Sequence, residues 1–260
     1  MSDPSGRAVV PAEPARYALL GSPAGHSLSP PMQAAAFASA GLDAVYEAID
    51  VEPGALGEAL ARLHARGYAG LNLTAPHKER ALRFAGSVTP EGARLGSVNT
   101  MKREPGGWAA HATDGLGFEA WAREASLPFR GARVALLGAG GAARAIAPYL
   151  ASLGAATIVV VGRDAARVAD VIAAAADAPG GAVWLPGSWQ AGAEGGAGGG
   201  GGAFDLIVRS LSAPESVPGE EPWWRAVAPG GAVIDLNYGP RAGPSRLRAA
   251  ALGLRFEDGR

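Results

Sequence analysis

The sequence predicts an α/β fold in two domains, each built on a parallel-rich sheet. Short apolar or β-branched segments alternate with segments of helical periodicity along most of the 260 residues. This alternation is typical of parallel strands that are joined by crossover helices. In the second half, a glycine-rich turn lies between an apolar strand and a helix, which indicates a Rossmann-type dinucleotide-binding domain.

In the first half, strands and helices are expected to alternate after a polar, proline-containing segment, residues 1–16, which we expect to be a disordered leader. Ser29 is expected to be the N-cap of the first helix, and Gly41 to end that helix. Pro76 ends the third strand, because proline has no N–H to give to a sheet ladder. The expected strands are 17–20, 44–49 and 69–74, and the expected helices are 32–40, 56–66 and 79–84.

In the second half, a connecting helix is expected at 115–124, so the domain boundary is placed at Asp114. Residues 191–203 are almost all glycine and alanine, and they are expected to form a flexible surface loop because they can bury little apolar area. The expected strands are 132–137, 156–161, 183–185, 204–208, 232–236 and 254–256; the expected helices run from the glycine turn to Gly154 and over 165–176 and 245–252.

The composition argues against several classes of protein. The formal net charge is −1, which gives no basic field for nucleic acid or for an anionic membrane. Cysteine is absent and the four histidines show no HExxH spacing, so we expect no disulfide, no thiol nucleophile and no metal site. There is neither an apolar run long enough to span a bilayer nor a signal-peptide pattern, and a cytoplasmic location is therefore expected.

The turn Gly138-Ala139-Gly140-Gly141-Ala142 is the candidate cofactor site. Gly138 permits a tight turn, and Gly140 lets backbone N–H groups approach a pyrophosphate in front of a helix N-terminus. The alternative is an ordinary turn in a glycine-rich chain, but the flanking strand and helix favour a dinucleotide site.

The end of the next strand bears on which dinucleotide binds. NAD sites place an acidic residue here for the ribose hydroxyls, whereas NADP sites favour a cation for the 2′-phosphate. The chain has Gly162-Arg163-Asp164. Arg163 can form a bidentate contact with a phosphate, whereas the charge of Asp164 would repel it. The prediction is NADP (NADPH), and NAD remains the alternative.

A second candidate site lies in the stretch GLNLTAPHK, residues 70–78. Asn72 and Thr74 point to the same face of a strand, and Lys78 follows where that strand ends, which is where ligands bind in open α/β sheets. Two hydrogen-bonding side chains and an ammonium group are thus expected to converge. The alternative is an ordinary turn with a solvated lysine.

Four ordered motifs extend this interpretation: SPAGHSLSP (22–30), NLTAPHK (72–78), GSVNT (96–100) and TDGLGF (113–118), followed by the GAGGAARA turn. Together they resemble shikimate dehydrogenases, which reduce 3-dehydroshikimate to shikimate with NADPH in aromatic amino acid biosynthesis. The resemblance extends from about Tyr17 to the end of the chain. It implies a substrate-binding domain over 17–113, an NADP-binding Rossmann domain over 114–260 and a substrate cleft between them.

The resemblance also implies roles for individual residues. Lys78 and Asp114 take the catalytic positions, and the lysine is the candidate proton donor to the carbonyl oxygen. The substrate-binding positions fall on Ser27, Ser29, Asn72, Thr74, Asn99, Thr113 and Tyr238. The cofactor positions fall on Gly138, Ala139, Gly140, Gly141, Ala142 and Arg163. We expect a small-molecule enzyme that is a monomer or a homodimer.

The chain departs from the family pattern at three places. Gly162-Arg163-Asp164 stands where the family usually has Asn-Arg-Thr, which would weaken the NADP preference. Arg209-Ser210-Leu211 stands where the family has Asn-Ala-Thr, and the arginine is expected to crowd the cofactor or contact its phosphates. The sequence ends at Arg260, before the family's last helix and its substrate-binding glutamine, so weaker substrate binding is expected.

These departures keep two alternatives open. One is a relative that acts on quinate or uses NAD. The other is a catalytically weak paralogue that binds a ligand or nucleotide without efficient turnover. The presence of Lys78, Asp114, Asn72 and Asn99 favours an enzyme over the paralogue.

Overall fold

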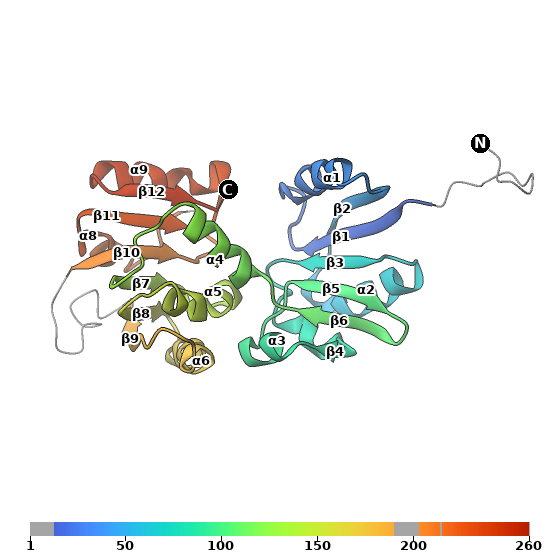
Figure 1. Cartoon of the computed structure of the whole chain (residues 1–260), viewed down its shortest axis with the longest axis horizontal. Helices are drawn as coiled ribbons and strands as arrows, with labels where there is room; N and C mark the ends of the chain where they lie inside the picture. Colours follow the sequence, from blue (N-terminus) through green and yellow to red (C-terminus); the bar gives the residue numbers. More distant parts are fainter. Residues whose placement is uncertain (1–12, 190–202, 214, 260) are drawn as a thin grey trace, which may run out of the picture. The chain divides into compact units, whose positions relative to one another are not determined.

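The computed structural model describes residues 13–189, 203–213 and 215–259. These residues form two compact units, each with a six-stranded sheet (Figure 1). The first unit comprises the described residues up to Val88 together with Asn99–Ala110, and the second comprises Thr89–Val98 and the described residues from His111 onward. The expected α/β class with two parallel-rich sheets is confirmed.

The sheet of the first unit has the strand order β2-β1-β3-β5-β6-β4. Its first three strands are parallel, as the alternation of strands and helices predicts, whereas β5 runs antiparallel to β3 and β4 runs parallel to β6. The strands are β1 (Ala15–Gly21), β2 (Ala44–Asp50), β3 (Gly70–Leu73), β4 (Ser87–Val88), β5 (Thr100–Glu104) and β6 (Gly107–His111). The helices are α1 (Ser29–Ser39), α2 (Leu56–Ala65) and the 3₁₀ helices η1 (Pro53–Ala55) and η2 (Arg80–Phe84).

Three expectations for this unit are wrong in detail. Helix α1 begins at Ser29 with Leu28 in the N-cap position, so Ser29 is not the cap, and its side chain instead pairs with Ser27. The helix expected at 79–84 is the short 3₁₀ helix η2. Strand β1 begins at Ala15, inside the expected leader, because it pairs with β2 from that residue onward. Of the rest of the leader, residues 1–12 lie outside the described residues.

The short elements between the two halves were not predicted. They are β4, β5, β6 and helix α3 (Pro90–Leu95), of two to six residues each, which is too short for a clear hydrophobic period. Helix α3 belongs to the second unit, where Tyr149 donates a 3.3 Å hydrogen bond to Glu91. The expected substrate-binding domain, 17–113, includes this segment, whereas the contacts of the structure group it with the second unit.

The sheet of the second unit has the strand order β12-β11-β10-β7-β8-β9, and each neighbouring pair is parallel (Figure 1). This is the Rossmann order, in which the chain reverses its direction of progress between β7 and β10. The strands are β7 (Arg133–Leu137), β8 (Thr157–Gly162), β9 (Val183–Ser188), β10 (Phe204–Arg209), β11 (Val227–Asp235) and β12 (Arg255–Asp258). The helices are α4 (Asp114–Glu124), α5 (Gly141–Ser152), α6 (Ala165–Ala175), α8 (Glu221–Arg225), η3 (Gly239–Ala242) and α9 (Gly243–Ala251).

Alternate residues of these strands pack on opposite faces of the sheet. On one face, residues such as Val134 and Leu206 pack with α4, α5 and α6. On the other face, their neighbours Ala135 and Ile207 pack with the buried tryptophans of α8 and with α9. The strands are therefore buried on both sides, which explains why they read as continuous apolar runs. Helix α8 was missed because it is only five residues long.

Two further observations concern the described residues alone. The glycine-rich segment expected to be a loop at 191–203 lies outside them, except for Ala203. Within the described ranges, no helix combines the length and the apolar character needed to cross a membrane.

Candidate active site

The carboxyl ends of β1 and β3 lie side by side in the first unit. The backbone N–H of Thr74 donates to Leu20 O at 2.9 Å, and that of Ser22 donates to Ala75 O at 3.2 Å. A Cβ atom at Gly21 would lie 2.5 Å from Thr74 Cγ2, so this glycine permits the close approach. The segment with Ser27 and Ser29 therefore leaves the sheet beside the segment with Thr74 and Lys78.

Asn72 is held by three neighbours at this edge of the sheet. The hydroxyl of Tyr46 donates to Asn72 Oδ1 at 2.8 Å, and Asn72 Nδ2 donates to Thr100 Oγ1 at 3.1 Å and to the backbone oxygen of Asn99 at 3.3 Å. Burial raises the pKa of Tyr46 to about 12, so its hydroxyl stays protonated and remains a donor at neutral pH. The orientation of the Asn72 amide is fixed by the backbone oxygen of Asn99, which can only accept a hydrogen bond.

Tyr46 and Thr100 are functional candidates that the sequence analysis missed. Thr100 is the last residue of the GSVNT motif, so its place in that motif was an available signal. Tyr46 had no comparable signal, because it lies on β2 and reaches Asn72 of β3 past the intervening strand β1.

The two serines form a small polar cluster before and at the start of α1. Ser27 Oγ lies 3.1 Å from both Ser29 Oγ and the backbone N–H of Ser29. The loop before them is anchored to β2, because the backbone N–H of Ala24 donates to Asp50. Both serines are only partly buried, so their hydroxyls can accept or donate hydrogen bonds to a ligand.

Lys78 follows a fully buried histidine. His77 is 0% exposed, and its Nε2 lies 2.7 Å from Val51 O, beyond the end of β2. Desolvation lowers the pKa of His77, so the ring is neutral and Nε2 donates its proton to Val51 O. His77 thus anchors the turn from which the half-buried Lys78 extends.

In the second unit, Asp114 is the first residue of α4, and Thr113 occupies the N-cap position. The helix expected at 115–124 thus begins one residue earlier than expected. Gly115 lies directly against α5, where a Cβ atom would overlap the ring of Tyr149 and the backbone oxygen of Ala145. This contact fixes the start of α4, and with it Thr113 and Asp114, against α5.

The glycine turn joins β7 to α5. Gly138 has φ +118°, in the region that favours glycine, and a Cβ atom there would lie 2.5 Å from Ser210 Oγ. At Gly140, by contrast, an added Cβ atom would meet no atom within 4 Å. Helix α5 has no side-chain cap at its N-terminus. Open space in front of an uncapped helix N-terminus fits a pyrophosphate group.

The exit of β8 lies next to this turn, because a Cβ atom at Gly162 would lie 3.1 Å from Ala139 Cβ. Arg163 follows and is exposed. Asp164 is the N-cap of α6 and accepts hydrogen bonds from the backbone N–H groups of Ala166 at 2.9 Å and Arg167 at 3.4 Å. Its carboxylate is thus used by the helix, which leaves Arg163 as the residue available for the cofactor.

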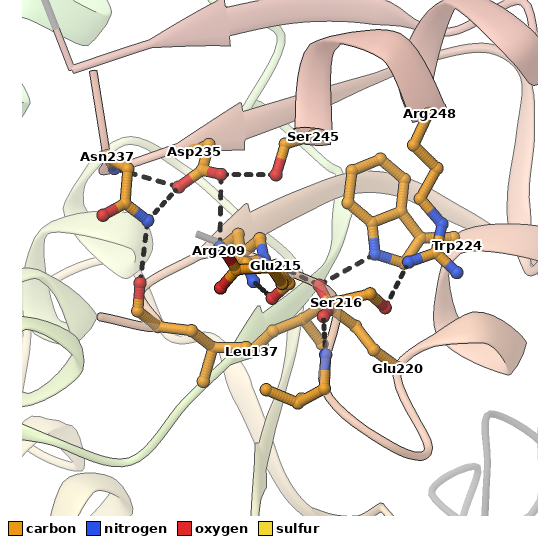
Figure 2. A network of polar contacts seen from close by, with 12 residues as sticks. Leu137, Arg209, Glu215, Ser216, Glu220, Trp224, Asp235, Asn237, Ser245 and Arg248 are labelled. Carbon is orange, nitrogen blue, oxygen red and sulfur yellow. Dashed lines mark hydrogen bonds and ion pairs between the residues drawn. The ribbon is translucent and has the colours of Figure 1, made fainter. Parts of the chain in front are cut away.

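Arg209 does not reach the cofactor site, contrary to the expectation from the sequence. It is 1% exposed and points to the face of the sheet that α8 and α9 cover. Its Nε donates to Glu220 Oε1 at 2.8 Å, and its guanidinium also pairs with Asp235 Oδ2 at 3.3 Å (Figure 2). The side chain is therefore fully engaged inside the protein.

Tyr238 lies where the chain leaves β11, immediately before η3. The predicted site residues thus divide between the units. The first unit holds Ser27, Ser29, Asn72, Thr74, Lys78 and Asn99, and the second holds Thr113, Asp114, the glycine turn, Arg163 and Tyr238. Among residues 13–189, 203–213 and 215–259, no three histidine or acidic side chains are grouped so that they could hold a metal ion.

Known proteins resemble both units. A family model described as the shikimate dehydrogenase substrate binding domain matches residues 19–101. The shikimate dehydrogenase (NADP(+)) of Moorella thermoacetica is 40% identical over 230 residues, which are 86% of this chain and 75% of that enzyme. The structure of Thermus thermophilus shikimate 5-dehydrogenase in complex with NADP(H) and shikimate has a TM-score of 0.75 at 31% identity and covers 94% of this chain and 87% of that one.

A ligand-free 5-ketofructose reductase of a Gluconobacter strain has a TM-score of 0.73 at 29% identity, over 95% of this chain and 87% of that one. The fold therefore also occurs in a protein with a different named activity. The match to the Moorella enzyme, over three quarters of its length, decides the family. The chain belongs to the shikimate dehydrogenase family.

Proposed function

We propose that this chain is an NADP-dependent shikimate dehydrogenase that reduces 3-dehydroshikimate to shikimate in aromatic amino acid biosynthesis. The observation that carries the proposal is the juxtaposition at the carboxyl edge of the first sheet. The segments after β1 and β3 are hydrogen-bonded to each other there, and Asn72 of β3 contacts Asn99. The residues assigned to the substrate in this unit are thus brought to one edge, in a chain of this family.

The chemistry of the site residues suits the reaction. The partly buried hydroxyls of Ser27 and Ser29 can hold the substrate carboxylate without adding charge. The side chains of Asn72, Thr74 and Asn99 offer hydrogen bonds to the ring hydroxyls, and such contacts discriminate against analogues that lack them.

NADPH, when bound, supplies the hydride for the carbonyl carbon. In the proposed mechanism the ammonium group of Lys78 donates a proton to the carbonyl oxygen and stabilises the negative charge that develops on it. Asp114 accepts a hydrogen bond from a substrate hydroxyl and orients the ring. Thr113 and Tyr238, which belong to the second unit, are assigned to the same substrate.

The cofactor assignment rests on the glycine turn and the exit of β8. The space in front of Gly140 and the N-terminus of α5 suit the pyrophosphate, and Arg163 suits the 2′-phosphate. The two domain roles, substrate binding over 17–113 and NADP binding over 114–260, are part of the same proposal. So are a cytoplasmic location and a monomeric or homodimeric state.

An activity matrix tests the proposal. NADP and NAD are each assayed with shikimate and with quinate, and 5-ketofructose is assayed with both reduced cofactors. The formation or consumption of reduced nicotinamide is followed by absorbance. The expected result is the highest kcat/KM with NADP and shikimate. A preference for quinate or NAD would replace the assignment, and nucleotide binding without turnover would favour the catalytically weak paralogue.

A further inference from the structure

A buried ion network lies beneath the carboxyl ends of β10 and β11. Arg209 is the last residue of β10 and Asp235 the last of β11, while Glu220 is the N-cap of α8. All three side chains are at most 1% exposed. Charges are costly to bury unless they are paired and hydrogen-bonded. The hydrogen bonds that pair these three side chains also reach backbone groups of the neighbouring segments, and those segments are the parts that the network holds in place.

Glu220 connects Arg209 to the segment that follows β10. Its Oε1 accepts from Arg209 Nε at 2.8 Å and from Trp224 Nε1 at 2.9 Å, and its Oε2 accepts from the backbone N–H of Val217 at 3.0 Å. Arg209 Nη2 also donates to Glu215 O at 2.7 Å. The connection from β10 to α8 is therefore tied to the network through backbone groups at two residues.

Asp235 connects the network to the exit of β11. Its Oδ2 accepts from Ser245 Oγ at 2.5 Å and pairs with Arg209, and its Oδ1 accepts from the backbone and side-chain nitrogens of Asn237 at 2.9 Å each (Figure 2). Asn237 Nδ2 then donates to Leu211 O at 2.8 Å. Asn237 thus bridges the exits of β10 and β11, directly before Tyr238.

The same exit of β10 contacts the glycine turn. Ser210 Oγ donates to Leu137 O at 2.9 Å, and Ser210 occupies the space that a Cβ atom at Gly138 would need. The exits of β7, β10 and β11 are thus joined around the point where the strand order reverses, which is where dinucleotides bind in this fold.

The position of the network within the sheet indicates which half of the cofactor it affects. The glycine turn and Arg163 follow β7 and β8, on the side proposed for the pyrophosphate and the adenosine phosphate. The sheet binds the two nucleotide halves on opposite sides of the switch point. The exits of β10 and β11, with Ser210, Leu211 and Tyr238, therefore face the nicotinamide half.

We propose that Arg209 is a positioning residue for the nicotinamide half of the cofactor. Through Glu220 and Asp235 it fixes the backbone at Leu211 and the Asn237-Tyr238 segment, without touching the cofactor itself. This inference rests on the proposed NADP-dependent function. It explains how a buried cation is accommodated where the family usually has asparagine, because two carboxylates, Glu220 and Asp235, compensate its charge.

The test uses two variants that keep different parts of the network. Arg209→Lys retains the buried positive charge but cannot reach both carboxylates and Glu215 O in the same geometry. Asn237→Ala removes only the bridge from Asp235 to Leu211 and leaves all three buried charges paired. Arg255→Lys is the matched control, because Arg255 forms a partly exposed pair with Glu257 at 2.8 Å on β12.

Binding of NADPH is compared with binding of 2′,5′-ADP, which carries the adenosine phosphates but no nicotinamide. Both network variants are expected to bind NADPH about tenfold more weakly and to lower kcat with shikimate by about tenfold, because the nicotinamide is misplaced. Their affinity for 2′,5′-ADP is expected to stay within about twofold of the parent chain, because the glycine turn and Arg163 lie outside the network. The control variant is expected to match the parent in every measurement.

Several outcomes would overturn the inference. Equal losses of affinity for NADPH and 2′,5′-ADP would indicate that Arg209 has only a general structural role. The same conclusion would follow if the variants lost NADPH affinity only in proportion to a lowered melting temperature. Unchanged NADPH binding and unchanged kcat in Asn237→Ala would show that the bridge from Asp235 to Leu211 does not position the nicotinamide. If the parent chain bound neither NADPH nor 2′,5′-ADP, the inference that Arg209 positions the cofactor would lose its basis. A parent chain inactive with shikimate would contradict the proposed function alone, because the two nucleotide affinities still test the network.

Discussion

The hydroxyl of Tyr46 donates a 2.8 Å hydrogen bond to the side-chain oxygen of Asn72 across the intervening strand β1. The amide nitrogen of Asn72 donates to Thr100 at 3.1 Å. Opposite ends of one amide are thus held by two strands, β2 and β5. Both hydroxyls could donate or accept, but Asn72 Nδ2 also donates to the backbone oxygen of Asn99 at 3.3 Å, and a carbonyl oxygen only accepts, so a flip would place two acceptors against each other. The asparagine that we assign to the substrate is therefore oriented by residues that do not belong to its own motif.

Replacing Tyr46 by Phe should raise KM for shikimate about three- to tenfold, because the amide of Asn72 loses a hydrogen bond worth about 1 kcal/mol. The KM for NADPH should not change. Steady-state kinetics with each substrate varied would measure both constants. Tyr17→Phe is the control, since Tyr17 packs its ring against Phe37 on α1. An unchanged KM for shikimate in Tyr46→Phe would show that the contact with Tyr46 does not position Asn72 for the substrate.

Replacing Lys78 by Ala should lower kcat by about 10²–10³-fold, because the reaction loses its proton donor. The affinity for shikimate, measured by calorimetry, should fall by no more than about threefold. Lys102→Ala is a matched control, because Lys102 is the only other lysine in the sequence and is exposed on β5. Near-normal turnover in Lys78→Ala would refute the assigned role.

The glycine turn provides two substitutions with different expected effects. At Gly140 there is room for a Cβ atom, so Gly140→Ala should leave the melting temperature unchanged but weaken NADPH binding at least about tenfold if the pyrophosphate occupies that space. At Gly138, φ +118° and the contact with Ser210 make alanine strained, so Gly138→Ala should lower stability by about 1–3 kcal/mol as well. Thermal unfolding and fluorescence titration would separate the two effects, with Gly54→Ala as the control.

Replacing Arg163 by Gln should raise KM for NADPH about tenfold and leave KM for NADH nearly unchanged, because only the former has a 2′-phosphate for the guanidinium. The ratio of kcat/KM for the two cofactors is the decisive measurement. Arg123→Gln, at the last turn of α4, is the control. Equal changes in kcat/KM for NADPH and NADH would show that Arg163 does not bind the 2′-phosphate.

The neutral, buried His77 should make the first unit sensitive to acid. Its pKa is lowered in the folded protein by desolvation, from an ordinary value of 6.5. Below that value the unfolded chain binds a proton that the folded chain does not, so the free energy of unfolding should fall as the pH drops below 6.5. The contribution of one such group cannot exceed about 1.4 kcal/mol per pH unit.

Urea unfolding at a series of pH values, from about pH 7.5 to about pH 5, would measure this slope. His77→Gln should reduce the slope, because glutamine does not titrate. The control is His26→Gln, at an exposed histidine, which should leave the slope as it is in the parent chain. A slope that persists unchanged in His77→Gln would assign the sensitivity to other groups.

Much of the fold could be predicted because its signals are local. The strands of the second unit are buried on both faces, so their sequences are unbroken apolar runs. The glycine turn can be identified from its residue types alone. The segments that could not be predicted are too short to show a hydrophobic period. Helix α8 is one of them, and its five residues include the buried Trp223 and Trp224. The helix cap was misplaced by one residue at Ser29, because the N-cap position falls on Leu28, whose side chain makes no capping hydrogen bond and therefore gives no signal in the sequence.

The sequence by itself determined the α/β class and the order of the motifs, because both depend on residue type and near-neighbour spacing. Most candidate site residues followed from the family resemblance that those motifs carry. Only the tertiary structure decided what holds those residues and where Arg209 points. The sequence predicts that Arg209 crowds the cofactor or contacts its phosphates, yet its position in the alternation of β10 directs it into the protein, on the face that α8 and α9 cover. Its carboxylate partners come from Glu220 and Asp235, 11 and 26 residues further along the chain. Pairings over such separations depend on strand order and register, which no local pattern encodes.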